Sequence, residues 1–170
     1  ELSRHDIEYK FLNVSAKNAV KQKNVHYMFN YTPYKLNKYD IDFGSICISE
    51  DISRYLSIGY TVTFTSIQLA VYMGFREIYL LGCDHNYSAV INRRGEIKRD
   101  STVQTYARGI PDWGKSVQNV EVTEYAYKVA RKYCDEHGIK IFNATRGGKL
   151  EIFERVNLDM LLDNIPEEEK

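Results

Sequence analysis

The sequence has few of the features that identify a specialised class of protein. Its three cysteines, Cys47, Cys83 and Cys134, are odd in number and widely spaced, and they include no CxxC pair. Such cysteines are typical of reduced thiols in a cytoplasmic protein and argue against a secreted scaffold held by disulfides. We expect them to pack as small hydrophobic side chains, because unpaired cysteines are usually buried.

Excess charge and long apolar runs are also lacking. The 170 residues include 23 basic and 23 acidic side chains, so the formal net charge is zero. This balance gives no general attraction to nucleic acid or to an anionic membrane. No apolar run approaches the roughly 20 residues that a membrane helix needs. We therefore expect a cytoplasmic protein with no membrane span and no nucleic-acid partner, while the oligomeric state is left open.

An initiator methionine is missing as well. The chain begins at Glu1 with ELSRHDIEYKFLNVS, and no targeting pattern opens it. We interpret residues 1–170 as a single α/β domain cut from a longer protein. A chain of 170 residues with 44% hydrophobic side chains suits one globular domain with its own core.

What the first third of the chain does contain is short runs of aromatic and β-branched residues. Residues 9–15 (YKFLNVS) and 25–31 (VHYMFNY) are two such runs, separated by a polar stretch. Residues 45–51 (SICISED) follow a turn-like segment and are a third candidate. Their composition predicts strands.

The next segment predicts a short buried helix. TVTFTS (residues 61–66) offers Thr65 or Ser66 as the N-cap, and the apolar run IQLAVYM follows. Gly74 suits the left-handed position beyond a helix end, and Phe75 suits the apolar contact that often accompanies it.

Two strands and two helices complete the prediction. Residues 78–83 are apolar on both faces, as in a parallel sheet covered by helices on each side. A long helix lies between Asn119 as cap and Gly138 as stop, then a strand at residues 139–142 and a terminal helix within residues 157–165. The apolar positions of the long helix recur at spacings of three and four: Val122, Tyr125, Ala126, Val129, Ala130 and Tyr133. The alternation predicts a Rossmann-like, three-layer α/β/α fold with a mainly parallel sheet.

Polar side chains follow the buried strand at residues 78–83. Open α/β sheets bind ligands at the carboxyl ends of their strands. Asp84, His85 and Tyr87 are therefore our candidate catalytic residues: the first two as a base or a partner of a substrate hydroxyl, and the phenol as a donor to a leaving phosphate. The alternatives are that Asp84 braces the loop, that His85 is solvated and that Tyr87 packs.

Two other segments are candidates for binding a nucleotide or its substrate. Thr63, Thr65 and Ser66 lie where hydroxyls and free N–H groups at a helix N-terminus can hold an anion, although ordinary capping explains one of them. NATRGG (residues 143–148) follows the strand at residues 139–142 and lacks the spacing of a Walker loop, so a plain turn is the alternative. Its candidate residues are Asn143, Thr145, Arg146, Gly147 and Gly148.

The long stretch from 86 to 118 predicts either a lid or a disordered loop. It is too long for a passive connection in a compact domain. Its tryptophan and basic residues suit closure over an anionic substrate. No HExxH or CxxC spacing occurs, so we predict no dedicated metal site, although Asp84 could share magnesium with a nucleotide phosphate.

Taken together, these residues resemble a known family. TVTFTSIQLAVYMGFREIYLLGCDHNYS and, after a helix, GIKIFNATRGGKLEIFERV are similar to bacterial members of the family named after the 6-hydroxymethylpterin diphosphokinase MptE, which includes motility accessory factors. YMGFREIYLLGCD is also similar to bacterial lipooligosaccharide sialyltransferases. The resemblance spans residues 61–156.

The resemblance implies a Rossmann-like, nucleotide-binding transferase. One branch moves diphosphate from ATP, with magnesium, to a pterin. The other moves a sugar from a nucleotide-sugar donor to a glycan, in polysaccharide or glycoconjugate biosynthesis at the cell surface or in flagellin modification. By position, Asp84 and Tyr87 match the strand-end segment of the sialyltransferases.

Two departures from the family pattern bear on the site. The glycine-rich nucleotide motif is absent, as expected if the nucleotide-binding part lay upstream of residue 1. The sialyltransferase histidine before the long helix is replaced by WGKSVQN, so either His85 takes that role or the chemistry differs.

Three hypotheses follow. The first is a glycosyltransferase-like enzyme with no permanently bound cofactor, using a small-molecule nucleotide donor and a glycan acceptor. The second is a pterin diphosphokinase. The third is a non-catalytic module that binds a nucleotide or a sugar.

Overall fold

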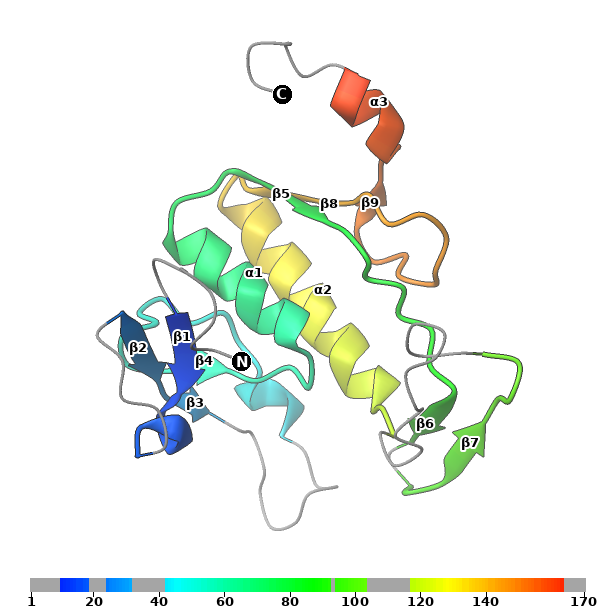
Figure 1. Ribbon diagram of the computed structural model, residues 1–170, viewed down its shortest axis with the longest axis horizontal. Helices are drawn as coiled ribbons and strands as arrows, with labels where there is room; N and C mark the ends of the chain where they lie inside the picture. Colours follow the sequence, from blue (N-terminus) through cyan, green and yellow to red (C-terminus); the bar gives the residue numbers. More distant parts are fainter. Residues whose placement is uncertain (1–9, 19–23, 32–41, 93, 104–116, 164–170) are drawn as a thin grey trace.

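The computed structural model describes residues 10–18, 24–31, 42–92, 94–103 and 117–163 (Figure 1). Two short 3₁₀ helices lie at Val14–Ala16 and Phe43–Ser45. The strands and α-helices are, in chain order, β1 (Lys10–Asn13), β2 (Val25–Met28), β3 (Asn30–Tyr31), β4 (Leu56–Ser57), α1 (Val62–Tyr72), β5 (Glu77–Leu80), β6 (Ala89–Ile91), β7 (Ile97–Arg99), α2 (Val120–Glu136), β8 (Lys140–Asn143), β9 (Glu154–Arg155) and α3 (Leu158–Asp163).

A parallel three-stranded sheet, in the order β5-β8-β9, lies beside the two long helices. Glu77 of β5 pairs with Lys140 of β8, and Phe142 of β8 pairs with Glu154 of β9. Parallel neighbours need a crossover connection, which α2 supplies between β5 and β8. Figure 1 shows α1 and α2 side by side, with this sheet along one side of the pair.

The fold is of the α/β class with mostly parallel strands. β1-β2 and β3-β4 are further parallel pairs, and β6-β7 is antiparallel. Helices from the described part of the chain cover one face of the β5-β8-β9 sheet, where Leu80 and Ile141 are buried in the main core. The three-layer arrangement stays a prediction.

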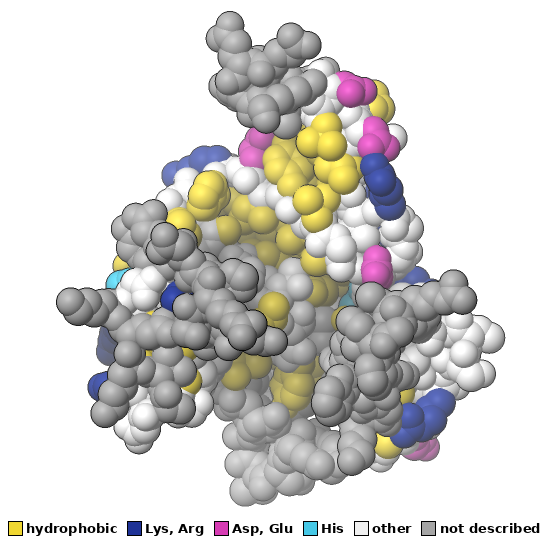
Figure 2. All heavy atoms as spheres, viewed as in Figure 1, with side chains coloured by type: hydrophobic (Ala, Val, Ile, Leu, Met, Phe, Trp, Pro, Cys, Tyr) yellow, Lys and Arg dark blue, Asp and Glu magenta, His cyan; other side chains and the backbone are white. Residues whose placement is uncertain are grey.

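The predicted burial of β5 on both faces is not borne out in the described part of the chain. Tyr79 is 41% exposed and stacks on Phe142 of the neighbouring strand, with ring centroids 5.1 Å apart. Leu81, just beyond β5, is 57% exposed. Figure 2 shows hydrophobic side chains exposed on the side of the molecule that carries β5 and α3. An apolar run fits a half-exposed strand as well as a buried one, because periodicity alone does not report what covers each face.

Helix α1 is confirmed, but it begins earlier than predicted and is not buried on most sides, since Val62 and Tyr72 are exposed. Thr61 is the N-cap, and its side chain accepts a hydrogen bond from the Thr63 N–H at 3.3 Å. Thr65 and Ser66 therefore lie inside the helix, and neither is the cap. The C-terminal prediction is confirmed at Gly74, which has φ +87°, although Phe75 beyond it is exposed.

Helix α2 matches its prediction closely. The Asn119 side chain accepts a hydrogen bond from the Val122 N–H at 3.3 Å, and Gly138 has φ +66° just beyond the helix end. Val122, Ala126 and Ala130 are buried at spacings of four. The strand at β8 and the terminal helix α3 are also confirmed.

In the first third of the chain two of the three strand predictions are confirmed, by β1 and by β2 with β3. Residues 45–51 do not form a strand. Instead, Ser49 and Ser57 both donate their backbone N–H groups to Oε1 of Gln68 at 3.2 Å, so a buried side chain of α1 replaces strand pairing here. A glutamine within an apolar helix gave no sign of this role in the sequence.

Part of the segment from 86 to 118 is regular. β6 and β7 form a hairpin in which Val90 pairs with Lys98, and Val90 also bridges to Gln118 just before α2. Residues 104–116, with Trp113, Tyr106 and Arg108, lie outside the described residues, so the lid stays a prediction.

All three cysteines carry free thiols. Cys134 is buried as expected, whereas Cys47 and Cys83 are only partly buried. Among the described residues, we find no helix with the length and apolar character needed to cross a membrane.

Candidate functional site

The segments that follow β5 and β8 meet beside the N-terminus of α1. The Cys83 N–H donates to Oγ1 of Thr145 at 3.0 Å, and the Lys149 N–H donates to the carbonyl oxygen of Asp84 at 2.7 Å. Sγ of Cys83 and Oγ1 of Thr63 are 3.9 Å apart, within hydrogen-bonding distance for sulfur. Parallel pairing of β5 with β8 brings the two strand ends to one edge, as the sequence predicted.

A small cavity of about 150 Å³ lies at this junction. It joins the first turn of α1 to the residues after β5 and to one side chain of α2. Its lining is Thr61, Thr63, Gly82, Cys83, Asp84, His85, Asn86, Tyr87 and Tyr127.

A second cavity, of about 280 Å³, adjoins the hairpin β6-β7 and the start of α2. Its lining is His85, Asn86, Tyr87, Val90, Lys98, Asp100, Val120, Glu124 and Lys149. His85, Asn86 and Tyr87 line both cavities, so they form the wall that the two share.

His85 is the most unusual residue of this wall. Its φ is +50°, a left-handed conformation that is uncommon for a residue other than glycine and often marks a functional site. Its side chain is only 5% exposed. Nδ1 lies 3.4 Å from the hydroxyl of Tyr87, whereas Nε2 is buried and has no hydrogen-bond partner among the described residues.

Glu124 of α2 places a carboxylate close to that nitrogen. Oε1 of Glu124 lies 3.6 Å from Nε2 of His85, which is close enough for charge interaction and too far for a hydrogen bond. Burial lowers the pKa of His85 below its usual value, and the negative charge of Glu124 opposes this shift in part. The imidazole is therefore neutral at neutral pH and can accept a proton.

Two tyrosines enclose the imidazole. The rings of Tyr87 and Tyr127 meet it edge to face, with centroids 5.4 Å and 5.9 Å away. Burial raises the pKa of Tyr87 to about 12 and also raises that of Tyr127, whose hydroxyl lies 3.3 Å from Oγ1 of Thr61. Both phenols stay protonated at neutral pH and act as hydrogen-bond donors.

Asp84 precedes this histidine and is exposed. It lines the small cavity, and its backbone is held by Lys149 and approached closely by Gly148. Main-chain contacts with the loop after β8 thus hold Asp84 at the cavity.

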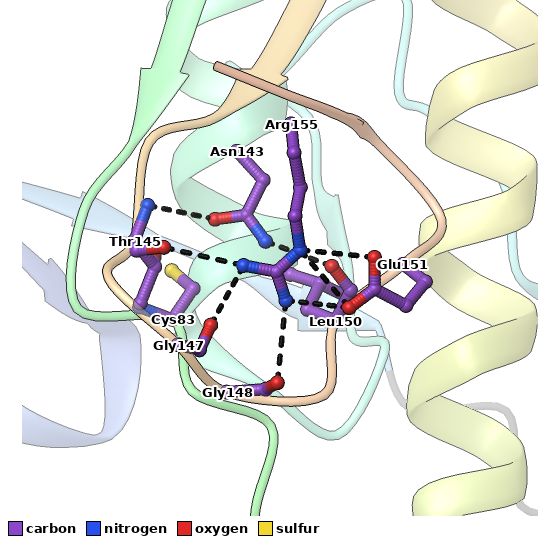
Figure 3. Close-up of polar contacts among 8 residues, drawn as sticks. All are labelled: Cys83, Asn143, Thr145, Gly147, Gly148, Leu150, Glu151 and Arg155. Carbon is purple, nitrogen blue, oxygen red and sulfur yellow. Dashed lines mark hydrogen bonds and ion pairs between the residues drawn. The ribbon is translucent and has the colours of Figure 1, made fainter. Parts of the chain in front are cut away.

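The loop after β8 curves around the guanidinium of Arg155 of β9 (Figure 3). The guanidinium donates to the carbonyl oxygens of Thr145 at 3.2 Å, Gly147 at 2.7 Å and Gly148 at 3.3 Å. It also binds both carboxylate oxygens of Glu151, at 2.9 and 3.0 Å from Nε. These bonds occupy carbonyl oxygens of NATRGG and fix the curvature of the loop.

Of the NATRGG candidates, Asn143 and Thr145 have internal roles. The buried Asn143 amide donates to the Leu150 carbonyl at 2.8 Å and accepts from the Thr145 N–H at 3.0 Å. Thr145 in turn receives the Cys83 N–H. Neither residue lines the two cavities.

The remaining residues of that loop differ in position. Arg146 is exposed and pairs with Asp159 of α3, away from both cavities. Gly147 and Gly148 both have φ +76°, and Gly148 alone abuts Asp84.

Of the three hydroxyl candidates on α1, Thr63 alone lines either of the two cavities. Thr63 lines the small cavity together with the cap residue Thr61. Thr65 lies outside that lining. Ser66 is exposed and donates to the Val62 carbonyl at 3.1 Å, within its own helix.

Sequence reasoning missed several residues of the site: Thr61, Asp100, Glu124, Tyr127, Lys149 and Arg155. Lys98 is one of the basic residues already predicted to suit a lid. Thr61 stood within the hydroxyl cluster and Lys149 directly after the paired glycines, so local signals existed for both. Glu124 and Tyr127 stand three residues apart on α2, a spacing that places them on one helix face but does not tell what that face meets.

No group of three histidine, cysteine, aspartate or glutamate side chains in the described ranges is arranged to hold a metal ion. The chain matches no protein-family model, no curated protein and no solved structure.

Proposed function

We propose that this chain is a nucleotide-dependent transferase that moves a sugar from a nucleotide-sugar donor to a hydroxyl of a glycan acceptor, in cell-surface polysaccharide or glycoconjugate biosynthesis. One observation carries the proposal. A buried histidine, whose Nε2 has no hydrogen-bond partner in the part of the chain that the structure describes, stands between two cavities at the carboxyl end of β5. Glycosyl transfer needs such a divided site, with a base placed between the donor and the acceptor.

The small cavity suits the donor phosphate. It lies at the N-terminus of α1, where the helix dipole favours an anion, and it carries the hydroxyls of Thr61 and Thr63. Tyr87 adds a phenol that stays protonated, since its pKa is raised to about 12. These donors would stabilise the negative charge that develops as the phosphate leaves.

The larger cavity suits the acceptor. The carboxylates of Asp100 and Glu124, the ammonium groups of Lys98 and Lys149 and the amide of Asn86 line it, and such groups hydrogen-bond to sugar hydroxyls. His85 forms the wall towards the donor side. An acceptor hydroxyl in this cavity can therefore reach both the base and the donor sugar.

The reaction can be written with all atoms assigned. The acceptor oxygen bonds to the anomeric carbon of the donor sugar while the bond from that carbon to the phosphate oxygen breaks. The acceptor proton passes to Nε2 of His85. The electron pair of the broken bond stays on the nucleotide phosphate, to which the Tyr87 hydroxyl donates a hydrogen bond. Asp84 orients a substrate hydroxyl at the edge of the small cavity.

Ligand-dependent thermal unfolding tests the class of donor. The panel contains CMP, CDP, UDP, GDP, ATP and a pterin, each at a series of concentrations. A donor nucleotide at a hundred times its dissociation constant adds about 2.7 kcal/mol to the free energy of unfolding. We expect stabilisation by at least one of the four sugar-donor nucleotides. Stabilisation by ATP and the pterin alone would instead favour a diphosphokinase.

Sugar transfer or donor hydrolysis tests the residues. We expect Asp84→Asn and His85→Gln each to slow turnover by about 10²-fold or more, in line with the loss of acid–base groups. Asp163→Asn, in the exposed end of α3, is the matched control and should keep full activity. Turnover that is the same in all four proteins would contradict the assignment, and binding without turnover would indicate a non-catalytic module.

A further inference from the structure

We infer that Glu124 is the positioning residue of this site, whose carboxylate stabilises the positive charge that His85 acquires when it takes the acceptor proton. The inference rests on the proposed function and adds a residue that its reaction did not include. Its basis is a buried imidazole nitrogen that has no hydrogen-bond partner among the described residues and lies 3.6 Å from a carboxylate oxygen. Both residues line the larger cavity.

The separation of the two groups fits a change of charge during the reaction. At 3.6 Å no hydrogen bond joins Nε2 of His85 to Oε1 of Glu124. When Nε2 gains a proton it becomes a cationic donor, and a small movement of the glutamate closes the distance to a charge-assisted hydrogen bond. The glutamate can move because its side chain is 44% exposed, whereas the histidine at 5% exposed is held in place.

The tautomer of His85 determines which nitrogen is free to act. If Nδ1 of His85 carries the hydrogen and donates it to the Tyr87 oxygen at 3.4 Å, then Nε2 keeps a lone pair that can accept a proton. In the same arrangement the phenol keeps its own O–H for the leaving phosphate. One tautomer of His85 thus leaves both Nε2 and the Tyr87 hydroxyl ready for the reaction.

Other charged or titratable groups also surround the imidazole. They come from its own segment, from α2, from the β7 side of the larger cavity and from the loop after β8: Cys83, Asp84, Tyr87, Tyr127, Lys98, Asp100 and Lys149. Glu124 is the group whose charge raises the pKa of His85 against the effect of burial. Its removal should therefore make His85 a weaker base.

The first measurement is an NMR titration of the His85 ring in the full chain. We expect Glu124→Gln to lower the pKa of His85 and Glu124→Asp to restore it in part, because aspartate keeps the charge. Glu136→Gln is the matched control, since Glu136 is an exposed glutamate of the same helix and pairs with Lys132 at the surface. His85→Gln identifies the resonance among the four histidines.

The second measurement is the dependence of turnover on pH. With a donor found active for the unmodified chain, Glu124→Gln should lower kcat about tenfold at neutral pH and move the acid limb of the profile to lower pH, with KM nearly unchanged. A glutamate with a purely structural role would lower stability and leave the position of the acid limb unchanged.

The two proposals fail in different ways. If the pKa of His85 is the same in the unmodified chain and in Glu124→Gln, the inference about Glu124 is overturned whatever the enzyme does. If that pKa shifts as expected but no nucleotide sugar is consumed by the unmodified chain, the pair exists and the glycosyl-transfer proposal is the one that fails. If the Glu124→Gln variant does not fold, the pKa of His85 is compared between the unmodified chain and Glu124→Asp.

Discussion

Gly148 lies directly against the backbone of Asp84. A Cβ atom at Gly148 would stand 2.6 Å from the Asp84 carbonyl oxygen and 2.8 Å from its Cα. The same carbonyl oxygen accepts the Lys149 N–H at 2.7 Å, so the Asp84 backbone cannot move away from such a Cβ atom without breaking this hydrogen bond. The close approach of these two residues joins the loop after β8 to the candidate catalytic segment.

Two neighbouring glycines therefore give a matched pair of variants. Gly147 and Gly148 share φ +76°, but a Cβ atom at Gly147 would meet nothing within 4 Å. We expect Gly147→Ala to cost about 1–2 kcal/mol, for its left-handed backbone alone. Gly148→Ala should cost more and should also reduce turnover, because it displaces Asp84. Urea unfolding and the transfer assay check both, and equal effects of the two variants would contradict the contact.

Gln68 is expected to be the most sensitive polar residue of the core. Its buried amide accepts the N–H groups of Ser49 and Ser57 at 3.2 Å and donates to the Ser57 carbonyl at 2.8 Å. Gln68→Leu leaves these backbone groups buried without partners, and we expect a loss of about 3 kcal/mol in the free energy of unfolding. Ser66→Ala, on the exposed side of the same helix, should change it by less than about 0.5 kcal/mol.

Arg155 is expected to control the loop that it supports. Lysine cannot reproduce the planar set of bonds to three carbonyl oxygens and to Glu151, so Arg155→Lys should release the loop. We predict faster amide hydrogen exchange at residues 145–149 and lower turnover. Arg131→Lys, whose main-chain contact is a single bond to Ile152, serves as the control. Unchanged exchange in Arg155→Lys would show that the loop holds its shape without the guanidinium.

His85 should make the protein sensitive to acid. Its pKa in the folded protein lies below the usual value of 6.5, so below pH 6.5 the unfolded chain binds a proton that the folded protein does not. The free energy of unfolding therefore falls as the pH drops from 6.5 towards the lowered folded value, and the loss is complete below that value.

The variant His85→Gln lacks the contribution of the His85 titration to the free energy of unfolding. Urea unfolding at pH 7.5 and at pH 5.5 should give a smaller difference for His85→Gln than for the unmodified chain. The other histidines contribute equally to both proteins and cancel in the comparison. A larger difference in the variant would mean that the pKa of His85 is raised, and not lowered, in the folded protein.

Local signals in the sequence determined the helices and several of the strands. The ends of α2 follow from Asn119 and Gly138, and its buried face follows from apolar residues three and four apart. These are interactions within one or two turns, so a short window of sequence contains them. The position of Asp84, His85 and Tyr87 beyond a strand was predictable for the same reason.

Where several local choices were equivalent, the tertiary structure decided. The cluster TVTFTS offers several hydroxyls that can cap a helix, and the structure uses Thr61, which follows Tyr60 in a left-handed conformation at φ +60°. The exposed face of β5 likewise depends on where the two long helices pack, which the apolar run at residues 78–83 does not specify.

The partners within the site were beyond the reach of the sequence. Glu124 lies beside His85, from which it is 39 positions away in the chain, and Arg155 donates to the carbonyl oxygen of Thr145. No spacing rule links such residues, because the contact exists only after the parallel pairing of β5 with β8 and the packing of α2 have brought them together. The sequence by itself determined which segments carry chemical groups, and only the folded chain decided which of those groups meet.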